Sequence, residues 1–288
     1  METESKKQTD VYSIINNRII EKLEEGVVPW RQPWNETGLP RNLITQKPYT
    51  GINVLLLTSM GFTRNYYLTF KQLKALGGGV KKNEKSIPVI FWKWSEKEDH
   101  FTKEIKKISL LRYYNVFNVD QCIGIPEHRI LSDDLPVNVN RTERIEAILE
   151  DMPKKPRIRH LSSQAYYHPK EDYISMPLMN SFKDTEGYYG VLFHELIHST
   201  GHSSRLNRKE VSEGVNFGSE PYSMEELVAE IGACYLKSYT NIDIKHFDNN
   251  VAYIQNWLNV LKNDRKFIIH ASAKSQRAVD YILNRLEI

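Results

Sequence analysis

The chain has 288 residues, of which 40% are hydrophobic and 26% are charged, and its formal net charge is +3. This length accommodates one large or two medium domains, each with its own core. No run approaches the ~18 apolar residues of a membrane span, and the first ten residues lack the apolar segment of a secretory signal. The two cysteines, Cys122 and Cys234, have no CxxC spacing and suit reduced thiols. We therefore expect a cytoplasmic protein without membrane association.

The charge is divided unevenly between the two halves of the chain. Residues 1–130 contain 20 Lys and Arg against 14 Asp and Glu, whereas residues 131–288 contain 19 against 22. The basic half also contains four of the five tryptophans, at positions 30, 34, 92 and 94. A basic, aromatic half joined to an acidic half predicts two domains with different tasks.

The basic half begins with a predicted helix, in which apolar residues recur at helical spacing from Val11 to Leu23 before Gly26 ends it. Loops follow over 27–34 and 40–53, the first interrupted by prolines that exclude a helix interior. Further along we expect an apolar segment over 54–60, a helix over 69–76 with Thr69 as its cap, strands over 87–94 and 108–119, and a polar turn over 97–107.

The second half begins after residues 124–140, where prolines and a polar run predict a linker. We expect a helix over 141–152, short strands over 157–160, 165–168 and 173–176, a helix after Asp184 that ends near Gly201, and helices over 223–236, 251–261 and 271–286. The predicted fold is α+β with two domains, 1–125 and 141–288, joined by a linker over 126–140.

Residues 194–198 read His-Glu-Leu-Ile-His, the pattern with the most specific chemical implication in the chain. Two histidines at i and i+4 lie on one helix face about one turn apart, so both imidazoles can bind the same Zn²⁺. Glu195 lies beside them, where its carboxylate can take a proton from a metal-bound water. We therefore predict His194 and His198 as metal ligands and Glu195 as the catalytic base.

A catalytic zinc usually has three protein ligands and leaves its fourth position to water. In the metzincin pattern the third histidine stands six residues after the second, which here is Ser204, so that pattern does not apply. His202 lies eight residues after His194, about 12 Å along a continuous helix, and could reach the ion only if the chain turned at Gly201. The better candidate is the second helix, predicted over 223–236.

This second helix carries several carboxylates on a face that borders the core. Ser223 is its predicted N-cap, with Glu226 three residues later. We assign Glu226 to the zinc, because a metal offsets the cost of burying a carboxylate. We assign Glu230, one turn further, to a hydrogen bond with the non-ligating nitrogen of a metal-bound His. Glu225 is the alternative ligand, and a solvated acidic helix start is the alternative to any metal.

Basic and aromatic residues alternate in the N-terminal loops, a combination that binds single-stranded DNA by stacking bases and pairing with phosphates. The residues that we predict to bind DNA are Trp30, Arg31, Trp34, Arg41, Tyr49, Lys81, Lys82 and Lys85. The alternative is that the aromatic residues fill a core and the lysines form a solvated face. Loop aromatics flanked by proline are harder to bury than strand aromatics, which favours binding.

A family resemblance extends over nearly the whole chain, through segments that keep the same order. These segments cover 26–34, 49–57, 68–72, 79–85, 116–121, 194–208, 225–230 and 264–271. The first five resemble the N-terminal domain of ArdC-type antirestriction proteins, and the last three resemble their C-terminal zincin-like domain. The motif positions His194, Glu195, His198 and Glu226 match that family as they stand.

The resemblance implies a single-stranded-DNA-binding domain fused to a metallopeptidase-like domain, in a protein of a mobile genetic element that protects entering DNA from host restriction. The expected cofactor is one Zn²⁺ or another divalent ion, and the expected partners are single-stranded DNA and a host restriction component or other protein substrate. We expect a zinc metallopeptidase, with Tyr222 or His202 near a developing oxyanion. The alternative is a non-proteolytic DNA shield in which the metal is structural.

Overall fold

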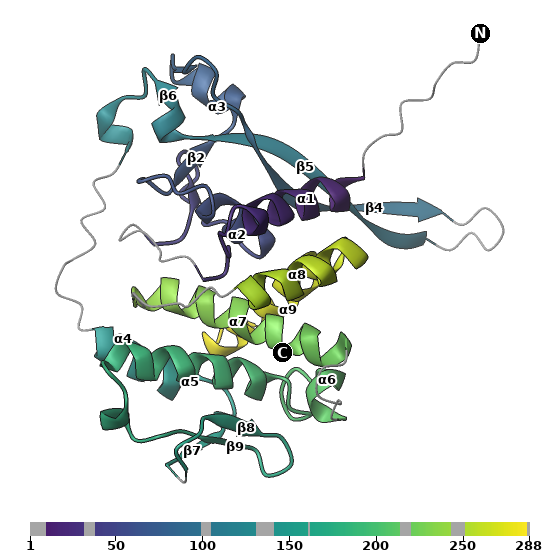
Figure 1. Cartoon of the computed structure of the whole chain (residues 1–288). Helices are drawn as coiled ribbons and strands as arrows, with labels where there is room; N and C mark the ends of the chain where they lie inside the picture. The colour runs from purple at the N-terminus through teal and green to yellow at the C-terminus, as the bar shows by residue number, and fades with distance from the viewer. Residues whose placement is uncertain are drawn as a thin grey trace.

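The computed structural model describes residues 10–31, 38–98, 105–130, 141–160, 162–213, 220–242 and 251–286. The helices are α1 (Val11–Glu24), α2 (Ile52–Thr58), α3 (Phe70–Ala75), α4 (Arg141–Asp151), α5 (Thr185–Thr200), α6 (Lys209–Ser212), α7 (Glu220–Thr240), α8 (Val251–Asn263) and α9 (Phe267–Ile282). The strands are β1 (Arg41–Asn42), β2 (Tyr66–Leu68), β3 (Gly79–Val80), β4 (Ile87–Glu98), β5 (Ile105–Asn118), β6 (Cys122–Ile123), β7 (Arg157–Arg159), β8 (Tyr166–His168) and β9 (Tyr173–Ser175). The predicted α+β class is confirmed (Figure 1).

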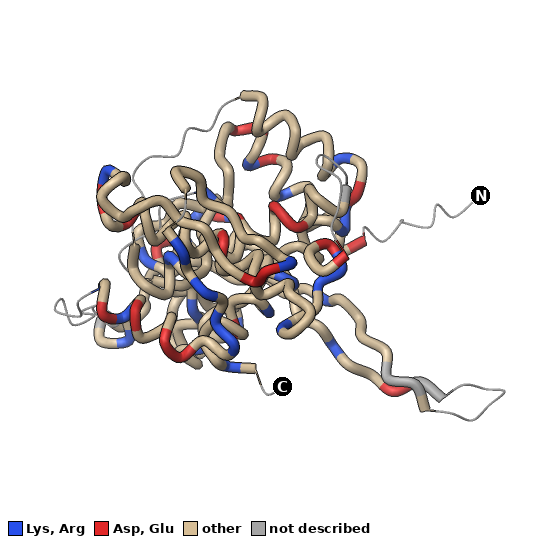
Figure 2. Tube along the Cα trace, turned by 90° about the horizontal axis from the view of Figure 1, so that it is seen from below, with Lys and Arg blue, Asp and Glu red and all other residues tan. Residues whose placement is uncertain are grey.

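The N-terminal half is built around a four-stranded sheet in the order β1-β2-β5-β4. Strands β1 and β2 pair in parallel, whereas β2–β5 and β5–β4 are antiparallel. The β4–β5 ladder continues from the pair Ile87↔Val116 to the pair Glu98↔Ile105, so these strands form a long two-stranded hairpin. This hairpin projects from the body of the protein in both views (Figures 1 and 2).

One hydrophobic core joins the two halves of the chain. In α1, Ile15, Ile19 and Leu23 are buried in the same cluster as the apolar faces of α5, α7, α8 and α9. Polar contacts cross the same boundary: the Asn16 side-chain amide donates to the Leu261 carbonyl at 2.8 Å. The predicted boundary residues of the two domains stay a prediction, but the core does not end at them.

In the C-terminal half, α5 and α7 pack against each other and against α9, and the three-stranded sheet β7-β9-β8 lies beside α5 (Figure 1). The close approach of α5 and α7 depends on Gly232, because a Cβ at this position would lie 2.6 Å from the Ile197 Cδ1 atom. Ala229 and Ala233 are buried on the same helix. Small residues on α7 therefore allow its carboxylates to approach the histidines of α5.

Several predicted elements differ from those observed. The apolar segment predicted over 54–60 is helix α2. Helix α7 begins at Glu220, so Ser223 lies inside the helix and is not its N-cap. Helix α9 begins at Phe267, earlier than predicted. The Thr69 cap of α3 is confirmed, since its hydroxyl accepts from the Gln72 amide. Within the described ranges no helix is both long and apolar enough to cross a bilayer.

Candidate metal centre

Helix α5 places His194 and His198 one turn apart, with their ring centroids separated by 4.7 Å. Its N-terminus is capped by the Asp184 carboxylate, which accepts from the Gly187 amide at 2.7 Å. At its other end the chain turns sharply at Gly201, where a Cβ would lie 2.5 Å from the Val211 side chain. The turn at this glycine brings the residues after α5 back against the histidine-bearing helix.

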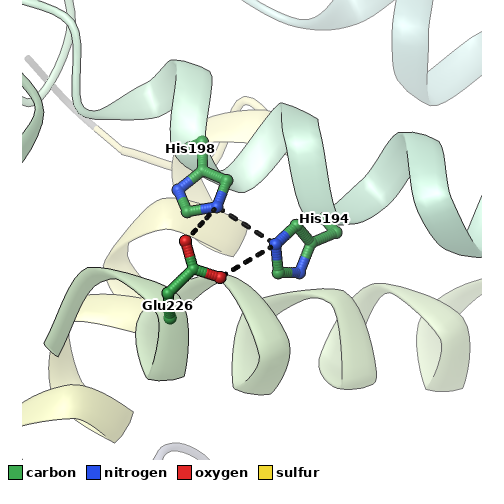
Figure 3. Close-up of side chains that lie close together, drawn as sticks. All are labelled: His194, His198 and Glu226. Atoms are coloured by element: carbon green, nitrogen blue, oxygen red, sulfur yellow. Dashed lines mark hydrogen bonds and ion pairs between the residues drawn. The ribbon is translucent and has the colours of Figure 1, made fainter. Parts of the chain in front are cut away.

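The side chains of His194, His198 and Glu226 point toward one another from the facing helices α5 and α7 (Figure 3). The Nε2 atoms of the two histidines lie 3.1 Å apart. Glu226 Oε2 lies 3.6 Å from His194 Nε2, and Glu226 Oε1 lies 3.7 Å from His198 Nε2. In the part of the chain that the structure describes, these three residues form a group whose candidate ligand atoms all lie within 4.8 Å of one another.

These separations fit a single divalent ion. For a tetrahedral ion with bonds of about 2.0–2.1 Å, neighbouring ligand atoms lie about 3.3–3.4 Å apart, and the separations of 3.1, 3.6 and 3.7 Å bracket this value. The local charge is also suitable: burial alone would lower the pKa of His198, but the carboxylates of Glu225, Glu195 and Glu226 raise it. The donor set therefore attracts a cation.

His198 is oriented by a buried ion pair behind it. Its Nδ1–H donates to Glu225 Oε1 at 3.1 Å, and Arg208 donates to both oxygens of the same carboxylate, at 2.8 and 2.6 Å. Burial alone would raise the pKa of Glu225, but Arg208 and His198 hold it at about 2. The ionised carboxylate can only accept, so the hydrogen bond fixes the proton on Nδ1 and directs the Nε2 lone pair toward His194 and Glu226.

The remaining polar residues near the cluster take distinct positions. The Glu195 carboxylate is buried, at 8% exposure, and lies close enough to His198 to raise its pKa. Burial and the neighbouring Glu226 carboxylate raise the pKa of Tyr222, which also hydrogen bonds to Glu226. His202 lies in the turn after α5, where its Nδ1 accepts from the Ser204 amide at 3.1 Å. Of the two residues predicted near the oxyanion, only Tyr222 contacts the cluster.

The role predicted for Glu230 is wrong. Its carboxylate accepts from the Trp30 indole N–H at 2.9 Å and from the Tyr253 hydroxyl, and it pairs with Arg31 at 3.4 Å. Glu230 lies one helical turn after Glu226 on α7, where it contacts residues of the N-terminal half and not the histidines. The hydrogen bond to the non-ligating nitrogen of His198 is made by Glu225 instead.

Two of the aromatic residues predicted to stack on DNA bases are buried, so those predictions are wrong. Trp30 is 2% exposed and packs edge-on against Trp257, and its indole N–H donates to the half-buried Glu230 carboxylate. Tyr49 is 8% exposed and packs edge-on against Tyr67. Both rings fill cores.

The other residues predicted to bind DNA differ in their accessibility. Arg31 is half-buried, with its guanidinium 3.6 Å from the Tyr253 ring centroid, and Arg41 is half-buried in β1. Trp34 lies outside the described residues. The side chains of Lys81, Lys82 and Lys85 are exposed, and Lys81 donates to the Asp120 carbonyl at 2.7 Å. The three lysines therefore remain accessible to a ligand.

The sequence did not predict the role of Arg208. No local pattern marks this residue, because its burial depends on the turn at Gly201 and on the facing helix. The exposed aromatic residues of the β4–β5 hairpin were also assigned only to strands. The consecutive apolar residues Ile90, Phe91 and Trp92 in β4 gave a usable signal, since a strand with large apolar residues on both faces needs a layer on each face.

The two helices, the paired histidines and the facing carboxylate define the class of zincin-like metallopeptidase domains. A family model described as zincin-like metallopeptidase matches residues 143–274, and a model for the N-terminal domain of anti-restriction factor ArdC matches residues 9–117. The chain belongs to the ArdC family of antirestriction proteins, which confirms the resemblance inferred from the sequence.

Similar structures and sequences extend over most of the chain. The metal-free crystal structure of the antirestriction ArdC protein from the R388 plasmid has a TM-score of 0.76 at 37% identity, covering 96% of this chain and 97% of that chain. Its Mn(II)-bound structure gives 0.75 at 36% identity, covering 96% and 98%. Uncharacterized protein y4eC of Sinorhizobium fredii (strain NBRC 101917 / NGR234) is 32% identical over 95% of this chain and 92% of its own length. DNA primase TraC of Escherichia coli is 32% identical over 94% of this chain, which spans only 20% of that protein.

Proposed function

We propose that this protein protects entering DNA of a mobile genetic element from host restriction, and that His194, His198 and Glu226 bind one divalent ion in the course of that activity. The observation that carries the proposal is the convergence of three ligand atoms from two helices within 4.8 Å. Zinc suits two imidazoles and a carboxylate. Manganese is the ion named for the similar R388 protein, and the same ligands accept it.

An open site supports a catalytic role over a structural one. Structural zinc sites are closed by four protein ligands, whereas catalytic sites keep a position for water or substrate. The side chains of His194 and Glu226 are 26% and 31% exposed, so the cluster is reached from solvent. A divalent ion held there would act as a Lewis acid and acidify a water molecule.

The residues of this chain would divide the remaining tasks of peptide hydrolysis. The Glu195 carboxylate accepts a proton and passes it to the leaving amine. Glu225 keeps the proton of His198 on Nδ1. The Tyr222 hydroxyl lies beside Glu226, from where it can donate to a developing oxyanion. The proposed protein substrate is a host restriction component or another protein, met in the cytoplasm where restriction acts.

We further propose that the N-terminal half binds single-stranded DNA. Lys81, Lys82 and Lys85 support this proposal, because three exposed ammonium groups within five residues can line the path of a phosphate backbone.

The test compares wild-type protein with Glu195→Gln and His198→Asn in a strain that restricts unmodified incoming DNA, with metal content measured by elemental analysis. We expect His198→Asn to lose metal, and Glu195→Gln to retain metal but lose protection. If Glu195→Gln protects as well as the wild type, the hydrolytic role is wrong and the alternative of a DNA-binding shield with a structural metal is favoured. If the wild type binds no stoichiometric metal, the metal assignment fails.

A further inference from the structure

Large apolar side chains are exposed on both faces of the projecting β4–β5 hairpin. Those exposed by more than a third are Phe91, Trp92, Trp94, Ile105, Ile108, Leu110, Tyr113 and Tyr114. Contiguous exposed apolar surface of this kind marks an interaction site in a folded protein. The hairpin stands away from the body, so its outer part has no covering layer among the described residues (Figure 1).

The strand register separates these side chains into two faces. Residues two apart along a strand, and residues directly opposite on its partner, point to the same side. Phe91 lies opposite Arg112, and Lys93 lies opposite Leu110. Tyr114 belongs to the same face, and its ring centroid is 5.8 Å from that of Phe91. We call this set the basic face of the hairpin.

The described side chains of the second face differ in charge from those of the basic face. Trp92, Trp94 and Tyr113 lie on it, together with the exposed carboxylate of Glu96. On the basic face, the described side chains include the cations of Lys93 and Arg112 and no carboxylate. Both faces of the hairpin therefore offer exposed aromatic rings, but among the side chains that the structure describes the cations lie beside the rings of the basic face.

We propose that the basic face of the β4–β5 hairpin binds single-stranded DNA, with Phe91 and Tyr114 stacking on bases and Lys93 and Arg112 pairing with phosphates. This inference rests on the DNA binding proposed above and assigns it to a surface. The combination suits a single strand, because unpaired bases present π-faces for stacking and the backbone requires cations. Residues on this face recur about every 7 Å along each strand, so the face can contact an extended chain at several positions.

The test measures binding of a fluorescein-labelled dT20 oligonucleotide by fluorescence polarisation at several salt concentrations. We expect Phe91→Ala and Tyr114→Ala each to weaken binding about tenfold or more. We expect Lys93→Gln with Arg112→Gln to reduce the slope of log K against log salt by about 1.4, since each phosphate contact on a single strand contributes about 0.7. The matched control is Trp94→Ala on the opposite face, which we expect to bind like the wild type.

The outcomes separate this inference from the function on which it rests. If the wild-type protein does not bind dT20, the proposed DNA binding itself is wrong. If the wild type binds and the variants of the basic face bind equally well, or if Trp94→Ala loses as much affinity, the surface assignment is overturned. The salt slope is an independent check, because a variant that merely unfolds loses binding at every salt concentration and loses its far-ultraviolet circular dichroism.

Discussion

Replacing Arg208 with Met should destabilise the protein by about 3–5 kcal/mol, because it leaves the buried Glu225 carboxylate without its cation. The side chains of Arg208 and Glu225 are 7% and 6% exposed. The guanidinium also donates to the Thr200 hydroxyl at 2.7 Å and the Ile197 carbonyl at 2.8 Å, which would lose these hydrogen bonds. The pKa of Glu225 gives a similar magnitude: a displacement from 4.5 to about 2 corresponds to roughly 3 kcal/mol at about 1.4 kcal/mol per unit.

The assay is urea unfolding of metal-free protein, followed by circular dichroism between pH 3 and 7. Since folding lowers the pKa of Glu225, its stabilising contribution is complete above about pH 4.5 and is lost as the pH falls toward 2. The difference in unfolding free energy between the wild type and Arg208→Met should therefore shrink in acid.

The double variant Arg208→Met, Glu225→Met should lose less stability than Arg208→Met alone. A surface control, Arg265→Met, breaks an exposed pair with Asp10 and should cost less than about 1 kcal/mol. A loss below 1 kcal/mol for Arg208→Met, or one that does not depend on pH, would refute the reasoning.

Three further predictions follow from single contacts. Gly232→Ala should destabilise the protein by about 1–3 kcal/mol in urea unfolding, because the new methyl group meets Ile197. Adding Ile197→Ala should restore part of the lost stability. If stability is not restored, the predicted contact is wrong. Glu225→Gln should weaken metal binding about 10–100-fold in a chelator competition titration, and unchanged affinity would show that the hydrogen bond to His198 does not tune the site. Burial raises the pKa of the Cys122 thiol to about 11. Iodoacetamide at pH 8 should therefore modify Cys122 far more slowly in the folded than in the unfolded protein. Equal modification rates would contradict this prediction.

The metal cluster was accessible from the sequence because its spacing is local. His194 and His198 are fixed by one helix turn, and a carboxylate near the start of a second helix was the remaining ligand to find. The assignment of Glu230 failed for a physical reason: residues one turn apart share a face of α7, but the partner of that face changes along the helix. At Glu226 it faces α5, whereas at Glu230 it faces Trp30.

The exposure of the residues predicted to bind DNA could not be read from local sequence patterns. Proline-flanked loop aromatics were expected to be harder to bury than strand aromatics, but Trp30 in a loop is buried and Trp94 in a strand is 68% exposed. Trp30 is covered by helices from the distant end of the chain, and the strand carrying Trp94 extends beyond its sheet. Burial in both places depends on which elements lie nearby in space, and the local pattern does not contain that information.

The helix α1 contributes Ile15, Ile19 and Leu23 to a core that also contains buried side chains of α2, α4, α5, α7, α8 and α9. We therefore expect the protein to unfold as one cooperative unit, so that calorimetry of the metal-free protein records a single transition. A truncation that keeps only the peptidase-like half uncovers the apolar side of α8 and α9 and invites aggregation. A recombination event that separates the two halves should leave apolar surface uncovered on both fragments, so we expect the two halves to be inherited together.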